Sequence, residues 1–416
     1  MCQPKNRIVE GAMLLMVFVA LLTACNQQSV HSVPPAQTVR VPQTSPQRTS
    51  PPEGSTPTPI PVTPTTEPMP PGLILYESNA GPGWEIWQMD GGGANKRVVV
   101  PFDQAAYGFG RYPIWSPDGQ HFAYLYAYDQ NGKRWDSIRI ADRGNPHTYQ
   151  VGEPARSVVC EWSDQHTLLV YLAYYGLSSG TYDLFTGTYD LSTALMSERI
   201  FPADYREYEQ YVCSPGCLRV AGFKREERQY FIQDLLTGER TVILQVPESG
   251  FVGSGTWQAN GKRLAFTYCR LGQDFCDLYT VRADGRDLHR VTDLGKQFNG
   301  AGSPEGMANI VWSPDEKWIA CNLRLWRESL SYLGVIHMEE GTVINLGIAL
   351  RGSSKPVWSP DSTKIAFVSN VRFEGGKFAD PYEDLDQWDI YTIDVHTKEI
   401  RRLTNDEAME MHIDWR

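Results

Sequence analysis

The sequence predicts an all-β chain, a seven-bladed β-propeller of four-stranded antiparallel blades, and three observations support this fold class. First, nearly the same phrase occurs three times, as IWSPDGQHFAY from Ile114, VWSPDEKWIAC from Val311 and VWSPDSTKIAF from Val357. Second, related units recur every 44 to 57 residues, which is the spacing of four-stranded propeller blades. Third, this region starts with a unit that lacks its first strand and finishes with a lone first strand.

Residues 1–24 have the pattern of a secretory signal peptide. Lys5 and Arg7 precede an apolar run over residues 11–22, which is too short to span a bilayer. The letters LLTAC, which end at Cys25, resemble the bacterial lipobox, in which the cysteine becomes lipidated. The resemblance implies an extracytoplasmic chain in a bacterial cell envelope, anchored to the membrane through lipid on Cys25. An ordinary signal peptide cut elsewhere, or a short membrane anchor, is the alternative.

Residues 25–72 predict a disordered stalk rich in proline and threonine. Thirteen of the 28 prolines lie in this stretch, which has almost no aromatic residues and so cannot form a core. Next to a lipidated cysteine, such a segment would hold the following domain clear of the membrane. A passive disordered leader is the alternative interpretation.

Residues 73–416 make up the predicted propeller domain, in which each unit has four strands. Around Trp257 these strands are GTW, RLAFTYC, DLYTVRA and LHRVTD. The proline, aspartate and glycine of SPDG favour a tight turn, and the serine and aspartate side chains can bond to its amides. The tryptophan before the turn supplies apolar area where neighbouring blades meet. The seven anchor positions are Trp115, Trp162, Cys213, Trp257, Trp312, Trp358 and Trp415.

The two ends of this domain are complementary. Residues 73–100 contain three strands without a first strand, and Met411–Trp415 has the pattern of a first strand alone. Pairing of Met411–Trp415 with Leu73–Ser78 would complete the seventh blade and bury two sheet edges. The units at Trp162, Cys213 and Trp257 depart from the repeated phrase, so the sequence constrains the blade count least in that region.

The repeats, from WSPDG through IAF to RRLT (Arg401–Thr404), resemble those of the TolB-type, WD-like Pro-Asp β-propellers. The resemblance covers residues 73–416. Members of this family serve as periplasmic interaction platforms, as non-catalytic propellers of prolyl-oligopeptidase-like enzymes and, in a few cases, as polysaccharide lyases. The resemblance therefore implies the fold and leaves several functions open.

The net charge and the cysteine content narrow the classes of partner and the disulfides to consider. The formal net charge of −11 argues against nucleic acid, whose phosphates require a basic face, and we expect a monomer. Six cysteines remain after Cys25 in an oxidising compartment. Cys269 and Cys276 flank a predicted hairpin turn, which predicts a disulfide between them. Cys213 and Cys217 could form a tighter one, and Cys321 takes the place of a buried Phe or Tyr of the sister repeats.

One face of the predicted propeller carries all the long connections, those from second to third and from fourth to first strand. We call it the long-loop face, and it is rich in aromatic residues. Loops on a rigid scaffold commonly carry function, which predicts a recognition surface there. The alternative is that these aromatic side chains pack the loops onto the blades. The candidate binding residues are Tyr107, Arg111, Tyr205, Tyr208, Phe298, Trp326, Arg327, Tyr382 and Trp388.

The run ADPYEDLDQWD gathers carboxylates that could hold Ca²⁺, and calcium is the one cofactor that the sequence brings into consideration. The candidate ligands are Asp380, Asp384 and Asp386. The run lacks the glycine and spacing of an EF-hand loop, and a solvated acidic loop is the alternative.

These observations favour a lipid-anchored, non-catalytic binding platform for a protein, a peptide or a glycan, acting through the long-loop face. The alternative is a carbohydrate-active enzyme, a polysaccharide lyase or glycosidase, with a site over the central channel. Glu161 and Asp414, each just before an anchor tryptophan, are the inward-facing carboxylates that such an enzyme could use. No residue is assigned a catalytic role from the sequence.

Overall fold

The computed structural model describes residues 72–144, 148–155, 157–162, 167–175, 182–191, 195–198, 208–270, 276–298, 304–325, 331–350, 355–369, 373–374, 377–378 and 388–416. They belong to one compact unit, Thr65–Arg416. The predicted signal peptide, Cys25 and the stalk lie outside them. Within these ranges, no helix combines the length and the apolar character needed to cross a membrane.

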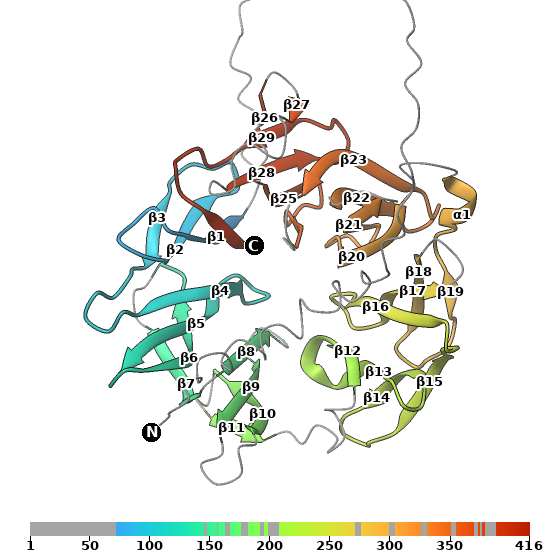
Figure 1. The fold of residues 1–416 in the computed structure, drawn as a ribbon, viewed down its shortest axis with the longest axis horizontal. Helices are drawn as coiled ribbons and strands as arrows, with labels where there is room; N and C mark the ends of the chain where they lie inside the picture. The colour runs from blue at the N-terminus through green and yellow to red at the C-terminus, as the bar shows by residue number, and fades with distance from the viewer. Residues whose placement is uncertain are drawn as a thin grey trace, which may run out of the picture. The chain divides into compact units, whose positions relative to one another are not determined.

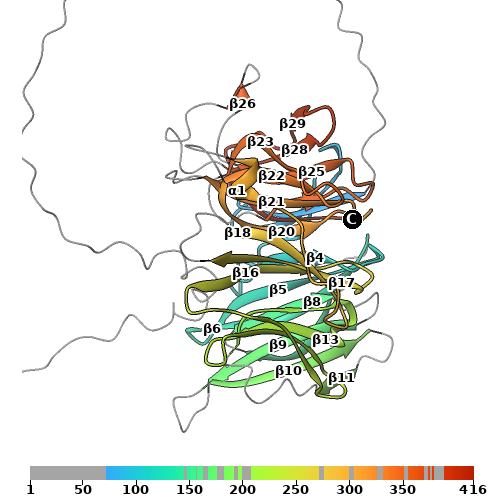
Figure 2. The ribbon, with the colours of Figure 1, turned by 90° about the vertical axis from the view of Figure 1, so that its right-hand side faces the viewer.

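The described residues form an all-β fold of four-stranded antiparallel sheets (Figures 1 and 2). The sheet that contains both ends of the domain comprises β1 (Leu73–Ser78), β2 (Glu85–Asp90), β3 (Arg97–Val100) and β30 (Glu410–Trp415). The next comprises β4 (Phe109–Trp115), β5 (His121–Gln130), β6 (Lys133–Asp142) and β7 (Thr148–Ala155). It is followed by β8 (Ser157–Trp162), β9 (Thr167–Tyr175), β10 (Tyr182–Asp190) and β11 (Leu195–Glu198).

Four further sheets follow in chain order. The first comprises β12 (Tyr208–Cys213), β13 (Arg219–Lys224), β14 (Gln229–Asp234) and β15 (Arg240–Gln245), and the second comprises β16 (Gly250–Trp257), β17 (Arg263–Arg270), β18 (Cys276–Arg282) and β19 (His289–Arg290). The third comprises β20 (Pro304–Trp312), β21 (Trp318–Leu325), β22 (Ser331–His337) and β23 (Val343–Leu350). The fourth comprises β24 (Val357–Trp358), β25 (Lys364–Ser369), β28 (Asp389–Asp394) and β29 (Ile400–Arg402). A hairpin of β26 (Phe373–Glu374) and β27 (Lys377–Phe378), the 3₁₀ turn Pro215–Cys217 and the short helix α1 (Leu294–Gln297) complete the described elements.

The first strands of the sheets lie nearest a common centre, and Figure 1 shows β4, β8, β12, β16 and β20 around it. Contacts run from β8 to β4, then through β30, β24, β20 and β16 to β12. We call these seven strands the inner strands. The arrangement matches a β-propeller, in which each sheet is a blade packed face to face on the next.

The predicted pairing of the chain ends is present. β30 runs antiparallel to β1, with Ile74 opposite Trp415 and Ser78 opposite Glu410. Beyond the strand, the N–H of Arg416 donates to the carbonyl of Leu73 at 3.0 Å. The last strand therefore supplies the inner strand that residues 73–100 lack, as the complementary ends predict.

The repeated phrase closes the turn between the first two strands of a blade. Ser116 Oγ lies 2.6 Å from Asp118 Oδ1, and the N–H of His121 donates to Ser116 Oγ at 2.9 Å. The same 2.6 Å contact recurs between Ser313 and Asp315 and between Ser359 and Asp361. These aspartates have a structural role, as the repetition predicts, because each holds the register of its own hairpin.

The anchor tryptophans join neighbouring blades through hydrogen bonds as well as apolar area. In four blades the indole N–H donates to a backbone carbonyl of the preceding inner strand, one residue before the anchor position. These bonds are Trp162 to Ile114, 3.1 Å; Trp257 to Val212, 3.1 Å; Trp312 to Thr256, 3.3 Å; and Trp358 to Val311, 3.1 Å. The indole N–H of Trp115 is buried without a hydrogen-bond partner among the described residues.

The core is divided into clusters that lie between adjacent sheets. One cluster joins Phe223 and Tyr230 of the β12–β15 sheet to Trp257 and Phe266 of the next sheet. Another joins Val335 to Trp358 and Tyr391 across the following boundary. Because each blade is apolar on both faces, its buried strands are near-continuous hydrophobic runs such as KIAFVS in β25.

Candidate functional site

Five inner strands carry a β-bulge at the same place. In each, two residues of the inner strand face one residue of the second strand, and the bulge includes the position three residues before the anchor. Bulges commonly re-aim a side chain next to a functional site. The bulged pairs are Tyr112–Pro113, Gln210–Tyr211, Gly253–Ser254, Asn309–Ile310 and His412–Ile413.

The bulges force several ordinary residues into left-handed backbone. Tyr112, Asn309 and His412 have φ of 51°, 50° and 46°. Such a conformation costs a residue with a side chain about 1 kcal/mol or more, and it persists only where the surrounding structure holds it. Its recurrence at equivalent positions of three blades identifies a feature of the scaffold rather than an accident of one loop.

We call Tyr112, Ser254, Asn309 and His412 the inner tier, because they occupy the position three before the anchor, lie in a bulge and have described side chains. Residues of this tier touch across blade boundaries. The N–H of Asn309 donates to Ser254 Oγ at 3.2 Å, and the rings of Tyr112 and His412 lie 4.2 Å apart between centroids. His412 is exposed and the other three are half-buried, whereas the anchor tryptophans beside them are buried. The tier therefore places polar side chains at one level of the inner strands, in reach of solvent.

A buried carboxylate supports one part of the tier. Glu77 in β1 is 1% exposed, and its Oε1 lies 2.9 Å from His412 Nδ1. The same oxygen accepts a hydrogen bond from the N–H of Tyr112. One carboxylate thus joins the bulges of β4 and β30, and it fixes which ring nitrogen of His412 is engaged.

One arginine contacts the tyrosine of the tier, and a second lies over the neighbouring Phe109. Arg111 donates from Nη2 to the hydroxyl of Tyr112 at 3.1 Å, and its guanidinium lies 4.9 Å from the centre of that ring. Arg134 lies over the ring of Phe109 at 4.9 Å. Burial raises the pKa of Asp136, an effect that the charges of Arg134 and Arg111 oppose. The site thus combines aromatic faces, guanidinium groups and an imidazole.

A second buried carboxyl lies at the start of β30. Glu410 is 0% exposed and has the hydroxyls of Ser78 and Thr404 at 3.3 and 3.1 Å from its two oxygens. Burial, together with the nearby charge of Asp406, raises the pKa of Glu410 to about 8. The hydroxyl of Thr404 has a single proton and also lies 3.3 Å from Asp389 Oδ1, so it cannot donate to both carboxyl groups at once. A proton on Glu410 supplies the second hydrogen that these contacts need.

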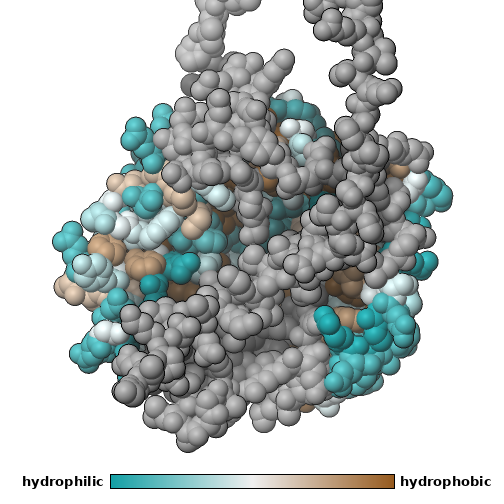
Figure 3. Space-filling view, viewed as in Figure 1, coloured by the Kyte–Doolittle hydropathy of each residue, from teal (hydrophilic) through white to brown (hydrophobic). Residues whose placement is uncertain are grey.

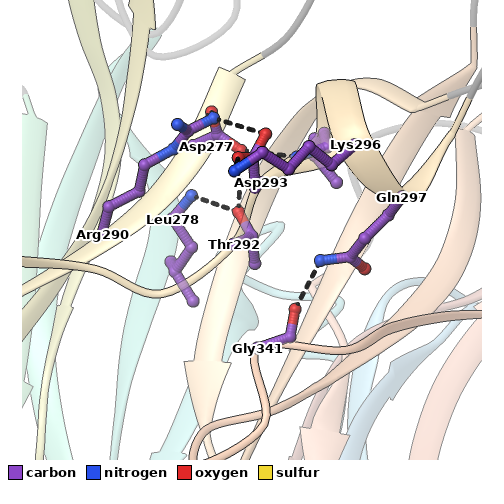
Figure 4. A network of polar contacts seen from close by, with 9 residues as sticks. Asp277, Leu278, Arg290, Thr292, Asp293, Lys296, Gln297 and Gly341 are labelled. Carbon is purple, nitrogen blue, oxygen red and sulfur yellow. Dashed lines mark hydrogen bonds and ion pairs between the residues drawn. The ribbon is translucent and has the colours of Figure 1, made fainter.

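The aspartate at the start of a third strand anchors the strand beside it (Figure 4). Asp277 accepts from Arg290 at 2.6 Å and from Thr292 at 3.0 Å, and the N–H of Leu278 donates back to Thr292 at 2.9 Å. Asp389, Arg402 and Thr404 repeat the arrangement in the β24–β29 sheet. These carboxylates serve the fold, which accounts for the repeated Arg-x-Thr at the last strands, Arg290–Thr292 and Arg402–Thr404.

The helix α1 extends this network to the next blade. Figure 4 shows Gln297 pointing toward Gly341, which lies in the turn between β22 and β23. Gln297 donates to the Gly341 carbonyl at 2.8 Å and accepts from the N–H of Val343 at 3.0 Å. Asp293 binds Arg290 and Lys296, both at 2.9 Å. The connection after β19 is therefore fixed on both sides.

The predicted binding residues divide into three groups. Tyr107 is 69% exposed in the connection from β3 to β4, with an edge contact to Phe102, and Arg111 adjoins the inner tier. Phe298 and Trp388 are partly buried and pack against hydrophobic clusters, which supports the packing alternative for them. Tyr205, Trp326, Arg327 and Tyr382 lie outside the described residues, as do Asp380, Asp384 and Asp386, and of Tyr208 only the backbone is described.

The structure corrects the position of two of these residues. The sequence predicts long loops over Pro101–Tyr112 and Phe201–Tyr211, but β4 already begins at Phe109 and β12 at Tyr208. Arg111 and Tyr208 therefore belong to inner strands and not to loops. The inner strands extend past their bulges, which interrupt the alternation of apolar and polar residues and so hide the start of each strand.

The two inward carboxylates predicted from the sequence have different outcomes. Asp414 Oδ2 accepts a hydrogen bond from the backbone N–H of Trp115 at 2.7 Å, and burial raises the pKa of this carboxyl. This bond joins β30 to β4, the boundary at which the indole N–H of Trp115 has no hydrogen-bond partner within the described ranges. The side chain of Glu161 lies outside the described part. Across the described ranges, no group of three or more His, Cys, Asp and Glu side chains has the arrangement of a metal site.

The predicted Cys269–Cys276 disulfide and the buried free thiol of Cys321 are confirmed. Cys269 and Cys276 face each other across β17 and β18 and form a disulfide. Cys213 is also disulfide-bonded. Cys321 is a buried free thiol opposite the bulge of β20, and burial raises its pKa.

The surface shown in Figure 3 is uneven in character. Hydrophilic side chains cover the region around β13–β15, whereas apolar and polar ones alternate over the sheets of β1–β3 and β4–β7. Val98, in β3, is 38% exposed, and Tyr107, between β3 and β4, is 69% exposed.

No protein-family model and no curated protein matches the sequence. Among solved structures, the chain is similar to a prolyl endopeptidase, with a TM-score of 0.55 and 10% identity, covering 83% of this chain and 49% of that one. It is similar to an oligogalacturonate lyase in complex with manganese, with a TM-score of 0.50 and 16% identity, over 80% of this chain and 86% of that one. TolB from Acinetobacter baumannii has a TM-score of 0.46 and 14% identity, over 83% of this chain and 66% of that one.

At these identities the likeness shows the fold alone. The chain spans about half of the endopeptidase and 66% of TolB. The all-β propeller architecture expected from the repeats is confirmed by the four-stranded sheets and by these structural neighbours.

Proposed function

We propose that this protein is a lipid-anchored binding platform of a bacterial cell envelope, without catalysis of its own. In this proposal residues 73–416 form a closed ring of seven blades. Residues 25–72 form the stalk and Cys25 carries the lipid. The pairing of β30 with β1 and the contacts between successive inner strands support the ring. The charged start, apolar run and LLTAC support the anchor.

The observation that carries the proposal is the inner tier. Bulges at equivalent positions hold exposed or half-buried polar side chains, three of them in left-handed backbone. Maintaining such a conformation is costly, and strained residues cluster where a ligand is held. Tyr107 and Arg111 continue the surface from the tier toward the long-loop face. A ligand that enters from this face would meet Tyr107 first and the tier beyond it.

Partner capture tests this function. The full chain, immobilised by a C-terminal tag, is exposed to envelope extract, and the retained species are compared with those of Tyr107→Ala and Arg111→Ala. Leu236→Ala is the matched control, because Leu236 is 74% exposed but lies in a turn on the opposite face. Loss of the same species with both variants but not with the control supports the proposal. Equal capture by all four proteins contradicts it.

A second candidate is a carbohydrate-active enzyme, and the pair of Glu77 and His412 favours it. A carboxylate held against Nδ1 orients an imidazole so that Nε2 can accept a proton. One structural neighbour is an oligogalacturonate lyase, which puts polysaccharides among the substrates to test. Reducing or unsaturated ends that accumulate with the full chain, and not with His412→Gln, would establish this candidate in place of the platform.

A further inference from the structure

We propose that the ligand of the inner tier is a glycan, held through its hydroxyl groups. This inference rests on the proposed function and names the class of ligand for the same site. It covers neutral and carboxylated glycans alike, because their shared chemistry is a row of hydroxyl groups on a ring with apolar C–H faces.

The kinds of side chain in the tier match hydroxyl groups. A hydroxyl both donates and accepts a hydrogen bond, and so do the phenol of Tyr112, the hydroxyl of Ser254 and the amide of Asn309. None of the seven positions three before an anchor is acidic, although the chain carries a net charge of −11. These positions are Tyr112, Val159, Gln210, Ser254, Asn309, Lys355 and His412.

Hydrogen bonds already present leave the right groups available. Tyr112 accepts from Arg111 at 3.1 Å, so its own O–H proton can be donated to a ligand. Ser254 accepts from the N–H of Asn309 at 3.2 Å and can donate in the same way. The Nδ1 atom of His412 lies 2.9 Å from Glu77 Oε1, an ion-pair distance, and this contact directs Nε2 away from that carboxylate. Within the described part of the chain, the hydroxyls of Tyr112 and Ser254 are therefore each supplied with one donor and can donate to a ligand.

Rigidity adds to the match. A bulge fixes the backbone of each tier residue, and contacts between Asn309 and Ser254 and between Tyr112 and His412 hold neighbours together. Groups fixed in advance lose little conformational entropy on binding, which matters for a ligand bound mainly through hydrogen bonds. The exposed ring of Tyr107 offers an apolar face for the C–H side of a sugar on the path to the tier.

The test is calorimetric titration of the full chain with defined oligosaccharides. One arm uses neutral fragments of β-glucan, mannan and xylan, and the other uses carboxylated fragments of alginate and polygalacturonate. Tyr112→Phe and Ser254→Ala each remove one hydroxyl and should weaken binding about 5- to 15-fold, the effect of one hydrogen bond. Tyr128→Phe removes the same group from β5, a second strand, and should leave the affinity within about 2-fold.

The outcomes separate the two proposals. Binding to fragments of either arm that both tier variants weaken, while Tyr128→Phe does not, supports the inference, and the arm identifies whether the ligand is neutral or acidic. Binding that the tier variants leave unchanged overturns it, because the site then lies elsewhere. If no fragment binds at millimolar concentration while Tyr107-dependent capture from extract persists, the glycan inference is wrong and the binding platform stands. If Tyr112→Phe fails to fold, Ser254→Ala alone decides, since it shortens a half-buried side chain by one oxygen.

Discussion

The substitution Glu410→Gln tests the buried carboxyl at the seam where the chain ends pair. Glutamine has nearly the same shape, can accept from Ser78 and can donate to Thr404, but it cannot ionise. The pKa of Glu410 is raised by burial and by Asp406 from 4.5 to about 8. The folded chain therefore keeps this proton over a pH range in which the unfolded chain releases it.

The sign and size of the effect follow from proton linkage. The folded state binds more protons between pH 4.5 and about 8, so the free energy of unfolding falls as the pH rises through this window. Each pH unit costs about 1.4 kcal/mol, which amounts to about 5 kcal/mol over the whole window and about 3 kcal/mol by pH 7. Below pH 4.5 and above pH 8 this carboxyl adds no further dependence.

Urea unfolding at pH 5, 6, 7, 8 and 9, followed by tryptophan fluorescence, measures the effect. Wild type and Glu410→Gln should have free energies of unfolding within about 1 kcal/mol at pH 5, and the variant should be more stable by several kcal/mol at pH 8. The difference between the two proteins cancels the contributions of every other titrating group. Parallel curves from pH 5 to 9 would refute the reasoning, because they would show that Glu410 ionises as it does in the unfolded chain.

Three further predictions concern the fold that positions the inner tier. Trp358→Phe removes the indole hydrogen bond to Val311, whereas Trp115→Phe makes the same change of ring without losing a hydrogen bond among the described residues. The first variant should therefore lose about 1–2 kcal/mol more of its free energy of unfolding than the second. Equal losses in urea unfolding would show that this hydrogen bond does not stabilise the fold. Asp277→Asn replaces the oxygen that accepts from Arg290 by an NH2 donor and removes the negative charge, while its remaining oxygen can still accept from Thr292 and Leu294; it should cost about 1–3 kcal/mol. Asp284→Asn alters an exposed ion pair and should cost under about 0.5 kcal/mol. Equal losses for the two variants in urea unfolding would contradict the anchoring role of Asp277. Replacement of both Cys269 and Cys276 by serine should lower the free energy of unfolding by about 2 kcal/mol. Peptide mapping of the wild type without reductant should find the two cysteines linked, and free thiols at both positions would contradict the disulfide.

The sequence was informative where a local rule acts within one repeat. The Ser-Pro-Asp turn, the buried anchor tryptophan and the complementary ends each follow from residues close together in the chain, and the structure contains all three. The Cys269–Cys276 disulfide was predictable for the same reason, since a hairpin brings its two strands together.

The candidate site was harder to predict from the sequence, because it depends on the register between strands that are far apart in the chain. Nothing in MHIDWR marks His412 as a bulged residue, and Glu77 meets it only because β1 pairs with β30. The signal that could have identified the tier is its period, three residues before each anchor, which is visible only once the blades are aligned. Phe298 and Trp388 were candidates because loop aromatics are common in binding sites, but hydrophobic clusters accommodate them, and sequence alone does not distinguish the two situations.

Hydrogen–deuterium exchange of the full chain, with and without a saturating glycan fragment, tests most directly whether the inner tier is where this protein recognises its ligand. Slower exchange is expected in the peptides that contain residues 110–113, 252–255, 307–310 and 410–413, with the turns on the opposite face unchanged. Protection confined to those turns or to the outer strands, with the bulged segments unaffected, would contradict the account.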